Sequence, residues 1–184
     1  VDIFSNGTNA SYLGNQHQIT YGAVPVGKEK VRFTSNHDQC AWDGTAIDIY
    51  GGLDASFAAF AATLFYPGVP LIYTGQEIGW NNQIPFFSNS TINWNYGAST
   101  LENYKKLMDV YTNNEEFKSG ALNDYSSSDV ICINREIVGN SAWCIVNTRN
   151  VISNFNLPFE LQNFSGTNLL DGSSFVVNGN TISL

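Results

Sequence analysis

The sequence predicts an α/β segment followed by an all-β segment, and two hydrophobic patterns carry that prediction. A short β-rich run at residues 30–35 and a continuous apolar run at residues 69–73 flank a stretch with apolar side chains at helical spacing. This is the pattern of a strand, a helix and a second strand. Beyond Gly120, apolar and polar residues alternate, as they do in half-buried strands. We therefore expect two domains, residues 1–120 and residues 121–184.

The helix between the two predicted strands should bury one face, because its apolar residues recur at i, i+3, i+4, i+7 and i+8. These residues are Phe57, Phe60, Ala61, Leu64 and Phe65. Pro67 and Gly68 then end the helix. The run at residues 69–73 contains no polar position, so we expect a strand covered on both faces. A helix that crosses between two such strands makes them parallel neighbours in one sheet.

Polar side chains follow both predicted strands. Asn36, His37 and Asp38 come directly after the first strand, and residues 74–77, Thr-Gly-Gln-Glu, close the second. In α/β folds, ligands bind beyond the carboxyl ends of the strands. The sequence therefore predicts that the chemistry of this protein lies at these two ends.

The two strand motifs resemble a known family. Residues 31–38, Val-Arg-Phe-Thr-Ser-Asn-His-Asp, and residues 66–77, Tyr-Pro-Gly-Val-Pro-Leu-Ile-Tyr-Thr-Gly-Gln-Glu, look like barrel strands seven and eight of the α-amylase superfamily of glycoside hydrolases. The resemblance implies the last two βα units of a TIM (β/α)8 barrel, followed by the C-terminal antiparallel β-sandwich domain of such enzymes. A complete barrel needs about 250 residues. This chain of 184 residues is too short to hold one.

The same resemblance assigns roles to the residues after the first strand. It implies that Asp38 is the acid that stabilises the transition state and that His37 hydrogen-bonds sugar hydroxyls. The nucleophile and the acid/base of the family belong to strands four and five, and those motifs are absent here. We therefore expect a C-terminal fragment of an enzyme that cleaves α-1,4-glucans with retention, inactive by itself. A Gly-x-Arg-x-Asp motif upstream of Val1 would favour an enzyme over the alternative, a non-catalytic glycan-binding or interaction protein.

Two further residues keep alternative interpretations. In the family, the residue that matches Glu77 supports a loop, but neighbouring strands lie only about 4.8 Å apart, so Glu77 and Asp38 could instead form an acid/base pair. Trp42 could stack on a sugar ring or could cap the mouth of the barrel, and both readings stay open. The aromatic residues of the loop after the second strand, Phe86 and Phe87 among them, are interpreted as packing residues.

Residues 1–29 are rich in Asn, Gly and Ser and predict a long loop or the remains of a preceding element.

In the second domain, a two-residue turn at Gly139-Asn140 would set Cys132 opposite Asn147 and leave the sulfurs of Cys132 and Cys144 on opposite faces of the sheet. We therefore expect free thiols. Further short strands are predicted at residues 155–158, 168–170, 174–177 and 181–184.

The composition limits the partners. A net charge of −8 and a pI near 4.5 argue against nucleic acid and anionic membranes, whereas a neutral α-glucan is compatible. The longest apolar stretch, residues 57–73, is interrupted by proline and glycine, which disfavours a membrane span. No cofactor or metal site is expected within this chain, although the resemblance is compatible with calcium in a full-length enzyme. The family implies an extracellular or periplasmic location, and the uncovered barrel strands predict a homo-oligomer or strand exchange.

Overall fold

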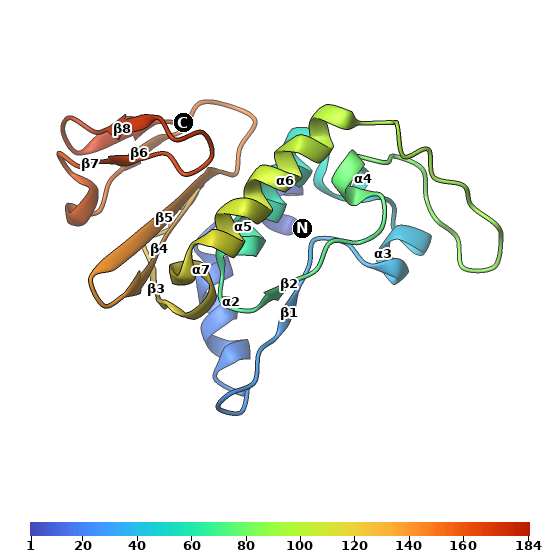
Figure 1. Ribbon diagram of the computed structural model, residues 1–184, viewed down its shortest axis with the longest axis horizontal. Helices are drawn as coiled ribbons and strands as arrows, with labels where there is room; N and C mark the ends of the chain where they lie inside the picture. The colour runs from blue at the N-terminus through green and yellow to red at the C-terminus, as the bar shows by residue number, and fades with distance from the viewer.

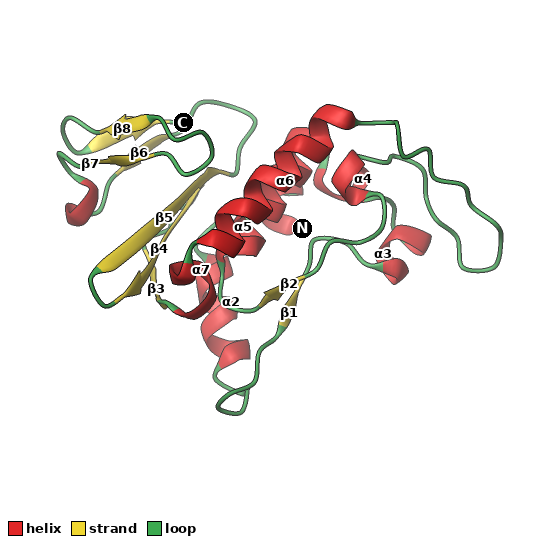
Figure 2. Ribbon diagram, in the orientation of Figure 1, coloured by secondary structure: helices red, strands yellow, loops and turns green.

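The computed structural model describes residues 1–184 and shows a mixed fold of helices and short sheets. Helices α5 (Leu53–Phe65) and α6 (Ala98–Asn113) run through the middle of the molecule (Figures 1 and 2). The pair β1 (Val31–Arg32) and β2 (Val69–Pro70) lies on one side of them, and the strands β3 (Ala121–Asp124), β4 (Val130–Ile137) and β5 (Asn140–Asn147) lie on the other. Three short helical segments and a long loop extend from the end of the β1 and β2 pair. None of the helices is both long enough and apolar enough to cross a membrane.

The predicted pair of parallel strands is confirmed, but it is much shorter than expected. β1 (Val31–Arg32) pairs in parallel with β2 (Val69–Pro70), and α5 (Leu53–Phe65) connects them. The expected burial of the second strand on both faces is wrong, because Val69 and Leu71 are exposed. Val31 and Phe33 are exposed as well, so one face of this two-stranded sheet has no covering layer.

Gly68 lets the chain turn from α5 into β2. Its φ of +139° lies in a region that only glycine adopts readily, and a Cβ atom there would lie 2.6 Å from the carbonyl oxygen of Lys30. The glycine thus permits the close approach of the two strands. α5 itself is buried on more than one side, because Phe60 and Leu64 pack in the main core while Ala59 packs against the neighbouring helix α4 (Ala46–Tyr50). The helix therefore buries more than the single face that its apolar spacing predicts.

Helices occupy parts of two segments that the sequence analysis did not predict as helical. Residues 1–29 contain α1 (Asp2–Ser5) and α2 (Tyr12–Tyr21), which agrees with the alternative of a preceding element. Residues 37–50 contain α3 (His37–Trp42) and α4. Both are capped by side chains, since Asn36 accepts a hydrogen bond from the backbone N–H of Gln39, and Thr45 and Asp48 form a reciprocal capping box.

α2 is attached to the βαβ unit by polar contacts. Nδ1 of His17 lies 2.6 Å from Nη2 of Arg32, and the guanidinium of Arg32 lies over the ring of Tyr66. The hydroxyl of Tyr66 in turn donates to Oδ2 of Asp124 at 2.6 Å. Gly14 of α2 passes so close to this carboxylate that a Cβ atom would lie 1.8 Å from its Oδ2. Contacts between distant segments, not its own sequence, therefore position α2.

The second half begins after α6 (Ala98–Asn113) and α7 (Glu115–Ser119) with a three-stranded antiparallel sheet. Its strands are β3 (Ala121–Asp124), β4 (Val130–Ile137) and β5 (Asn140–Asn147). The β4–β5 hairpin is confirmed, but its turn lies at residues 138–139, so Cys132 faces Ile145 and not Asn147. A shift of two residues keeps each side chain on its face. Cys144 accordingly packs in the helical core and Cys132 in a second cluster, and both thiols are free and buried.

Shorter strands complete this half. β6 (Asn154–Asn156) pairs with β9 (Thr181–Ser183), β7 (Ser165–Thr167) pairs with β8 (Ser174–Val176), and a 3-10 turn, η2, spans Phe159–Leu161. The strand predicted at residues 168–170 is wrong, because Oδ1 of Asn168 accepts from the backbone N–H of Leu170 and forms the turn between β7 and β8. One face of the three-stranded sheet packs on the helices and the other on these strands.

Arg135 joins the sheet to two helices. It lies on β4, is almost completely buried, and donates hydrogen bonds of 3.0 Å to the carbonyl oxygens of Phe65 and Gly120. Phe65 is the last residue of α5 and Gly120 follows α7, so one guanidinium binds the C-terminal ends of both helices. The boundary proposed at residue 120 therefore falls between elements that share a hydrophobic core.

Candidate active site

A short segment connects the end of β1 at Arg32 to α3, which begins at His37. Asn36 has an extended backbone, with φ of −145°, and its Oδ1 accepts a hydrogen bond of 2.9 Å from the N–H of Gln39. His37 and Asp38 are therefore the first two residues of α3, and the helix fixes their backbone. Their position at this strand end agrees with the sequence prediction.

The side chains of His37 and Asp38 face solvent. They are 64% and 67% exposed, and Nε2 of His37 lies 3.7 Å from Oδ2 of Asp38. The pair is therefore free to contact a ligand, and its donor and acceptor atoms point away from the core. The ring of His37 also packs on Phe86, with the ring centroids 5.6 Å apart.

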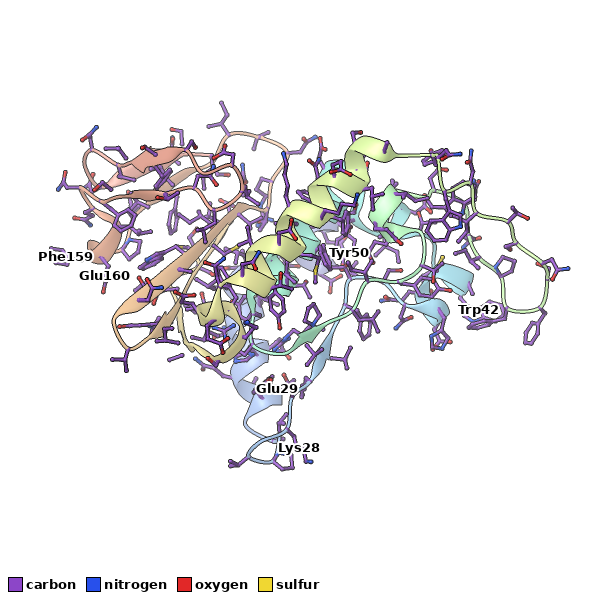
Figure 3. All side chains as sticks on the ribbon, in the orientation of Figure 1. Lys28, Glu29, Trp42, Tyr50, Phe159 and Glu160 are labelled. Atoms are coloured by element: carbon purple, nitrogen blue, oxygen red, sulfur yellow. The ribbon has the colours of Figure 1, made fainter.

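Trp42 lies at the other end of α3 and is 66% exposed. Figure 3 shows its side chain at the outer end of the molecule, beside the long loop that follows β2. The indole packs against Phe86 in an edge-to-face arrangement, with ring centroids 5.8 Å apart. Within this chain Trp42 is thus an exposed aromatic surface next to His37 and Asp38, and its role as a sugar-stacking residue stays a prediction.

A buried hydrogen-bond network lies where the chain leaves β1 and β2. Gln76 follows β2 in the 3-10 turn η1 (Gln76–Ile78), and its Nε2 donates to the hydroxyl of Thr34 at 2.7 Å and to the hydroxyl of Tyr104 at 3.1 Å. The network joins the segments after β1 and β2 to α6. Tyr104 is a core residue of α6, and burial raises the pKa of its hydroxyl to about 12. The phenol therefore stays neutral.

Glu77 is held differently from Asp38. Its Oε2 is buried without a hydrogen-bond donor, as are Oε1 of Gln76 and Oε1 of Gln39. The carboxylate of Asp38 is exposed, and the two acids share no hydrogen bond. The alternative of an acid/base pair formed by these residues therefore finds no support in a direct contact.

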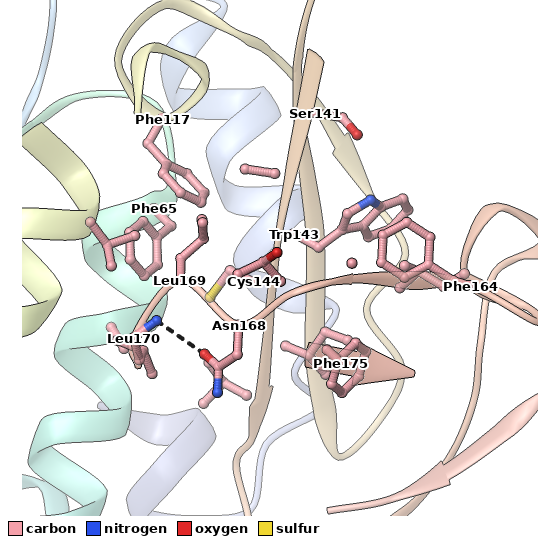
Figure 4. Close-up of a pocket in the computed structure, with 18 of the residues that line it drawn as sticks. Phe65, Phe117, Ser141, Trp143, Cys144, Phe164, Asn168, Leu169, Leu170 and Phe175 are labelled. Atoms are coloured by element: carbon pink, nitrogen blue, oxygen red, sulfur yellow. Dashed lines mark hydrogen bonds between the residues drawn. The ribbon is translucent and has the colours of Figure 1, made fainter. Parts of the chain in front are cut away.

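A predominantly apolar cavity lies elsewhere. It has a volume of about 480 Å³ and extends along β5 between the helices and the C-terminal strands, where Phe65, Phe117, Trp143 and Phe175 line it (Figure 4). Of its 21 lining residues 17 are hydrophobic, and none is an acid, a base or a histidine. This cavity therefore offers no acid or base of its own. No three His, Cys, Asp or Glu side chains come together as metal ligands.

Sequence reasoning named His37, Asp38 and Trp42 as candidate site residues, and the structure places all three in α3, which follows β1. It did not indicate the contacts that Phe86 and Gln76 make. Phe86 connects His37 to Trp42 although it lies more than 40 residues away, and the predicted packing role did not indicate which rings it would contact. Gln76 was noted only as part of the closing motif, whereas the structure joins it to Thr34 and Tyr104 by hydrogen bonds. No local pattern in the sequence indicates these two contacts.

No protein-family model and no curated protein sequence matches this chain. Solved structures do resemble it. An α-amylase from Lactobacillus plantarum matches with a TM-score of 0.75 at 18% identity, over 95% of this chain and 40% of that one. A cyclic α-maltosyl-(1→6)-maltose hydrolase from Arthrobacter globiformis matches with a TM-score of 0.70 at 18% identity, over 100% of this chain and 41% of the hydrolase. A debranching enzyme from Nostoc punctiforme matches with a TM-score of 0.67 at 18% identity, over 80% of this chain and 31% of the debranching enzyme.

The chain thus spans less than half the length of each of these structures. The likeness fits a mixed helix and sheet fold shared with part of each of these enzymes. At such low identity the likeness concerns the fold alone. This chain has the fold of the C-terminal part of α-amylase superfamily enzymes.

Proposed function

We propose that this chain is the C-terminal part of an α-amylase-type glycoside hydrolase that cleaves α-1,4-glucans with retention of configuration. The observation that carries the proposal is the exposed pair His37 and Asp38 at the end of a parallel strand, in a fold shared with amylases. A structure of this fold, named AmyP, is a complex with maltose, and a variant of it is a complex with maltotriose.

The proposed mechanism gives this chain one of the three acids. Positive charge develops on the sugar ring as the glycosidic bond breaks. The exposed carboxylate of Asp38 stabilises that charge and hydrogen-bonds the distorted sugar, while His37 donates to a hydroxyl beside the cleavage point. The nucleophile and the proton donor come from parts of the barrel outside these residues. The chain of 184 residues alone should therefore not hydrolyse starch, because one stabilising acid does not replace two reacting carboxyl groups.

The test is the variant Asp38→Asn in the complete enzyme that carries this segment. We expect kcat on a maltooligosaccharide to fall by about 10² to 10³, with a much smaller change in KM, because the charge matters most in the transition state. Asp43→Asn, the same chemical change at the other end of α3, is the matched control and should leave kcat unchanged. A near-normal kcat for Asp38→Asn would reject the assignment.

A second variant separates the two readings of Glu77. If Glu77 supports a loop, Glu77→Gln keeps most of the activity, since the amide fills the same space as the carboxylate. A loss as large as that of Asp38→Asn would favour an acid/base pair. If the complete protein binds maltooligosaccharides but hydrolyses none of them, the non-catalytic glycan-binding alternative is correct.

A further inference from the structure

The segment that connects β1 to α3 has few contacts that fix its position within this chain. The ladder between β1 and β2 ends where the carbonyl oxygen of Arg32 accepts from the N–H of Leu71, and residues 33–35 make no backbone–backbone hydrogen bond. α3 makes no extensive contact with another helix or strand of the chain, and Figure 1 shows it apart from α5 and α6. The position of His37 and Asp38 therefore depends on how this connecting segment is held.

One side-chain hydrogen bond holds the segment. Nε2 of Gln76 donates to Oγ1 of Thr34 at 2.7 Å, and this is the only hydrogen bond of residues 33–35 within this chain. The same Nε2 donates to the hydroxyl of Tyr104 at 3.1 Å. The amide of Gln76 thus connects the segment after β1 to α6.

All three members of this network are buried. Thr34 and Tyr104 are each 2% exposed, and Gln76 is 8% exposed. The packing of this chain alone produces that burial, so any further part of a longer protein only lowers the exposure. A hydrogen bond away from water is stronger than one at the surface, and an unpaired polar group there is costly. The amide therefore holds the two hydroxyl groups at fixed positions.

The network reaches the candidate acid through a short path. Thr34 lies two residues before Asn36, whose side chain caps α3. A shift of Thr34 therefore moves the cap and the first two residues of the helix, His37 and Asp38. A catalytic group must be held within about 0.5 Å of its productive position, and a displacement of about 1 Å can lower the rate about 100-fold. A hydrogen bond at the base of this segment is thus suited to set the position of Asp38.

We propose that Gln76 is a positioning residue of the candidate active site. It sets the position of Asp38 through Thr34 without contacting the substrate, and Tyr104 holds its amide from α6. This role rests on the proposed function, because the group that the network positions is the acid at residue 38. Loss of the network should lower kcat and leave KM nearly unchanged, since the charge of Asp38 acts mainly in the transition state.

The kinetic test uses Thr34→Val in the complete enzyme that carries this segment. Valine keeps the branched shape of threonine but lacks the hydroxyl, so the change removes the hydrogen bond and preserves the packing. We expect kcat on a maltooligosaccharide to fall about 10-fold, with KM within about 2-fold. Gln76→Met should show the same split, and Thr34→Ser, which keeps the hydroxyl, should retain most of the activity. Thr63→Val removes a hydroxyl that bonds within α5 and is the matched control.

A double-mutant cycle with Asp38→Asn separates positioning from general damage. If Thr34 acts through Asp38, Thr34→Val should lower kcat by less than about 2-fold once residue 38 carries no charge. A fall of about 10-fold in both backgrounds would reject the positioning role. A normal kcat for Thr34→Val, in an enzyme that Asp38→Asn inactivates, would reject it as well and leave the proposed function intact.

Hydrogen exchange on the 184-residue chain tests the same linkage without any activity. The backbone N–H of Gln39 donates to Oδ1 of Asn36 and reports on the cap of α3. We expect Thr34→Val to speed its exchange about 3- to 10-fold, and Thr34→Ser and Thr63→Val to leave it unchanged. An unchanged rate in Thr34→Val would overturn the linkage even if the complete protein is a glycosidase. A faster rate in a protein that hydrolyses no glucan would keep Gln76 as the residue that positions α3 and reject only the glycosidase assignment.

Discussion

Replacing Arg135 should separate the two halves of the core more effectively than any surface change. Its guanidinium is buried and donates to the carbonyl oxygens of Phe65 and Gly120, at the C-terminal ends of α5 and α7. No carboxylate pairs with it, and burial lowers the pKa of this guanidinium from its usual value. Its stabilisation therefore comes from helix carbonyl groups and not from an ion pair.

The expected magnitude follows from these contacts. Each hydrogen bond from a charged donor contributes about 1.5 to 3 kcal/mol, and the cost of burying the guanidinium offsets part of that sum. In Arg135→Met the volume is largely kept, while two carbonyl groups at helix ends lose their donor. We expect a loss of about 2 to 5 kcal/mol.

Urea unfolding followed by circular dichroism measures this loss. With an m-value of about 2 to 3 kcal/mol/M, the midpoint should fall by about 1 to 2 M. Arg135→Lys keeps the charge but loses the planar guanidinium with its several N–H donors. Its urea midpoint should therefore lie between that of the original chain and that of Arg135→Met. Lys118→Met removes an exposed pair with Glu115 and is the control, with an expected change below about 0.5 kcal/mol. An Arg135→Met protein as stable as the original would show that desolvation cancels the hydrogen bonds and would refute the reasoning.

Three further predictions concern the N-terminal half. Burial, helped by the adjacent guanidinium of β1, lowers the pKa of His17 from 6.5 to about 4. The unfolded chain therefore binds a proton that the folded chain excludes, so the free energy of unfolding should fall by about 1 to 2 kcal/mol as the pH drops from about 6.5 to 4, a value reduced because the ring is half-exposed. The urea midpoint of His17→Gln should lack this part of the pH dependence. An equal loss of stability in both proteins would contradict the assignment. Gly14→Ala should destabilise the chain, by about 1 to 3 kcal/mol, because the added methyl group meets the carboxylate of Asp124, and an unchanged melting temperature would show that α2 shifts freely. The uncovered edges of β1 and β2 should make the 184-residue chain a dimer or larger oligomer through strand pairing, whereas light scattering that gives a monomer with a protease-resistant βα unit would reject this.

The sequence alone determined those features that depend on short-range pattern. The apolar spacing of residues 57–65 and the Pro67-Gly68 stop predicted α5, and the apolar runs on either side predicted two parallel neighbours. Alternation predicted the β4–β5 hairpin and the separation of Cys132 from Cys144, since a side-chain period of two survives a shift of two residues. The strand-end motifs also located His37 and Asp38 at the carboxyl end of β1.

Only the tertiary structure decided what depends on contacts between distant segments. No local pattern indicates that Arg135 reaches the end of α5, 70 residues away, or that Phe86 lies between His37 and Trp42. α2 carries almost no amphipathic pattern and is held by the contacts of His17 with residues of the βαβ unit. Such contacts form because buried polar groups must find partners and apolar surfaces must be covered, and the chain meets both demands with whichever segments the fold brings together.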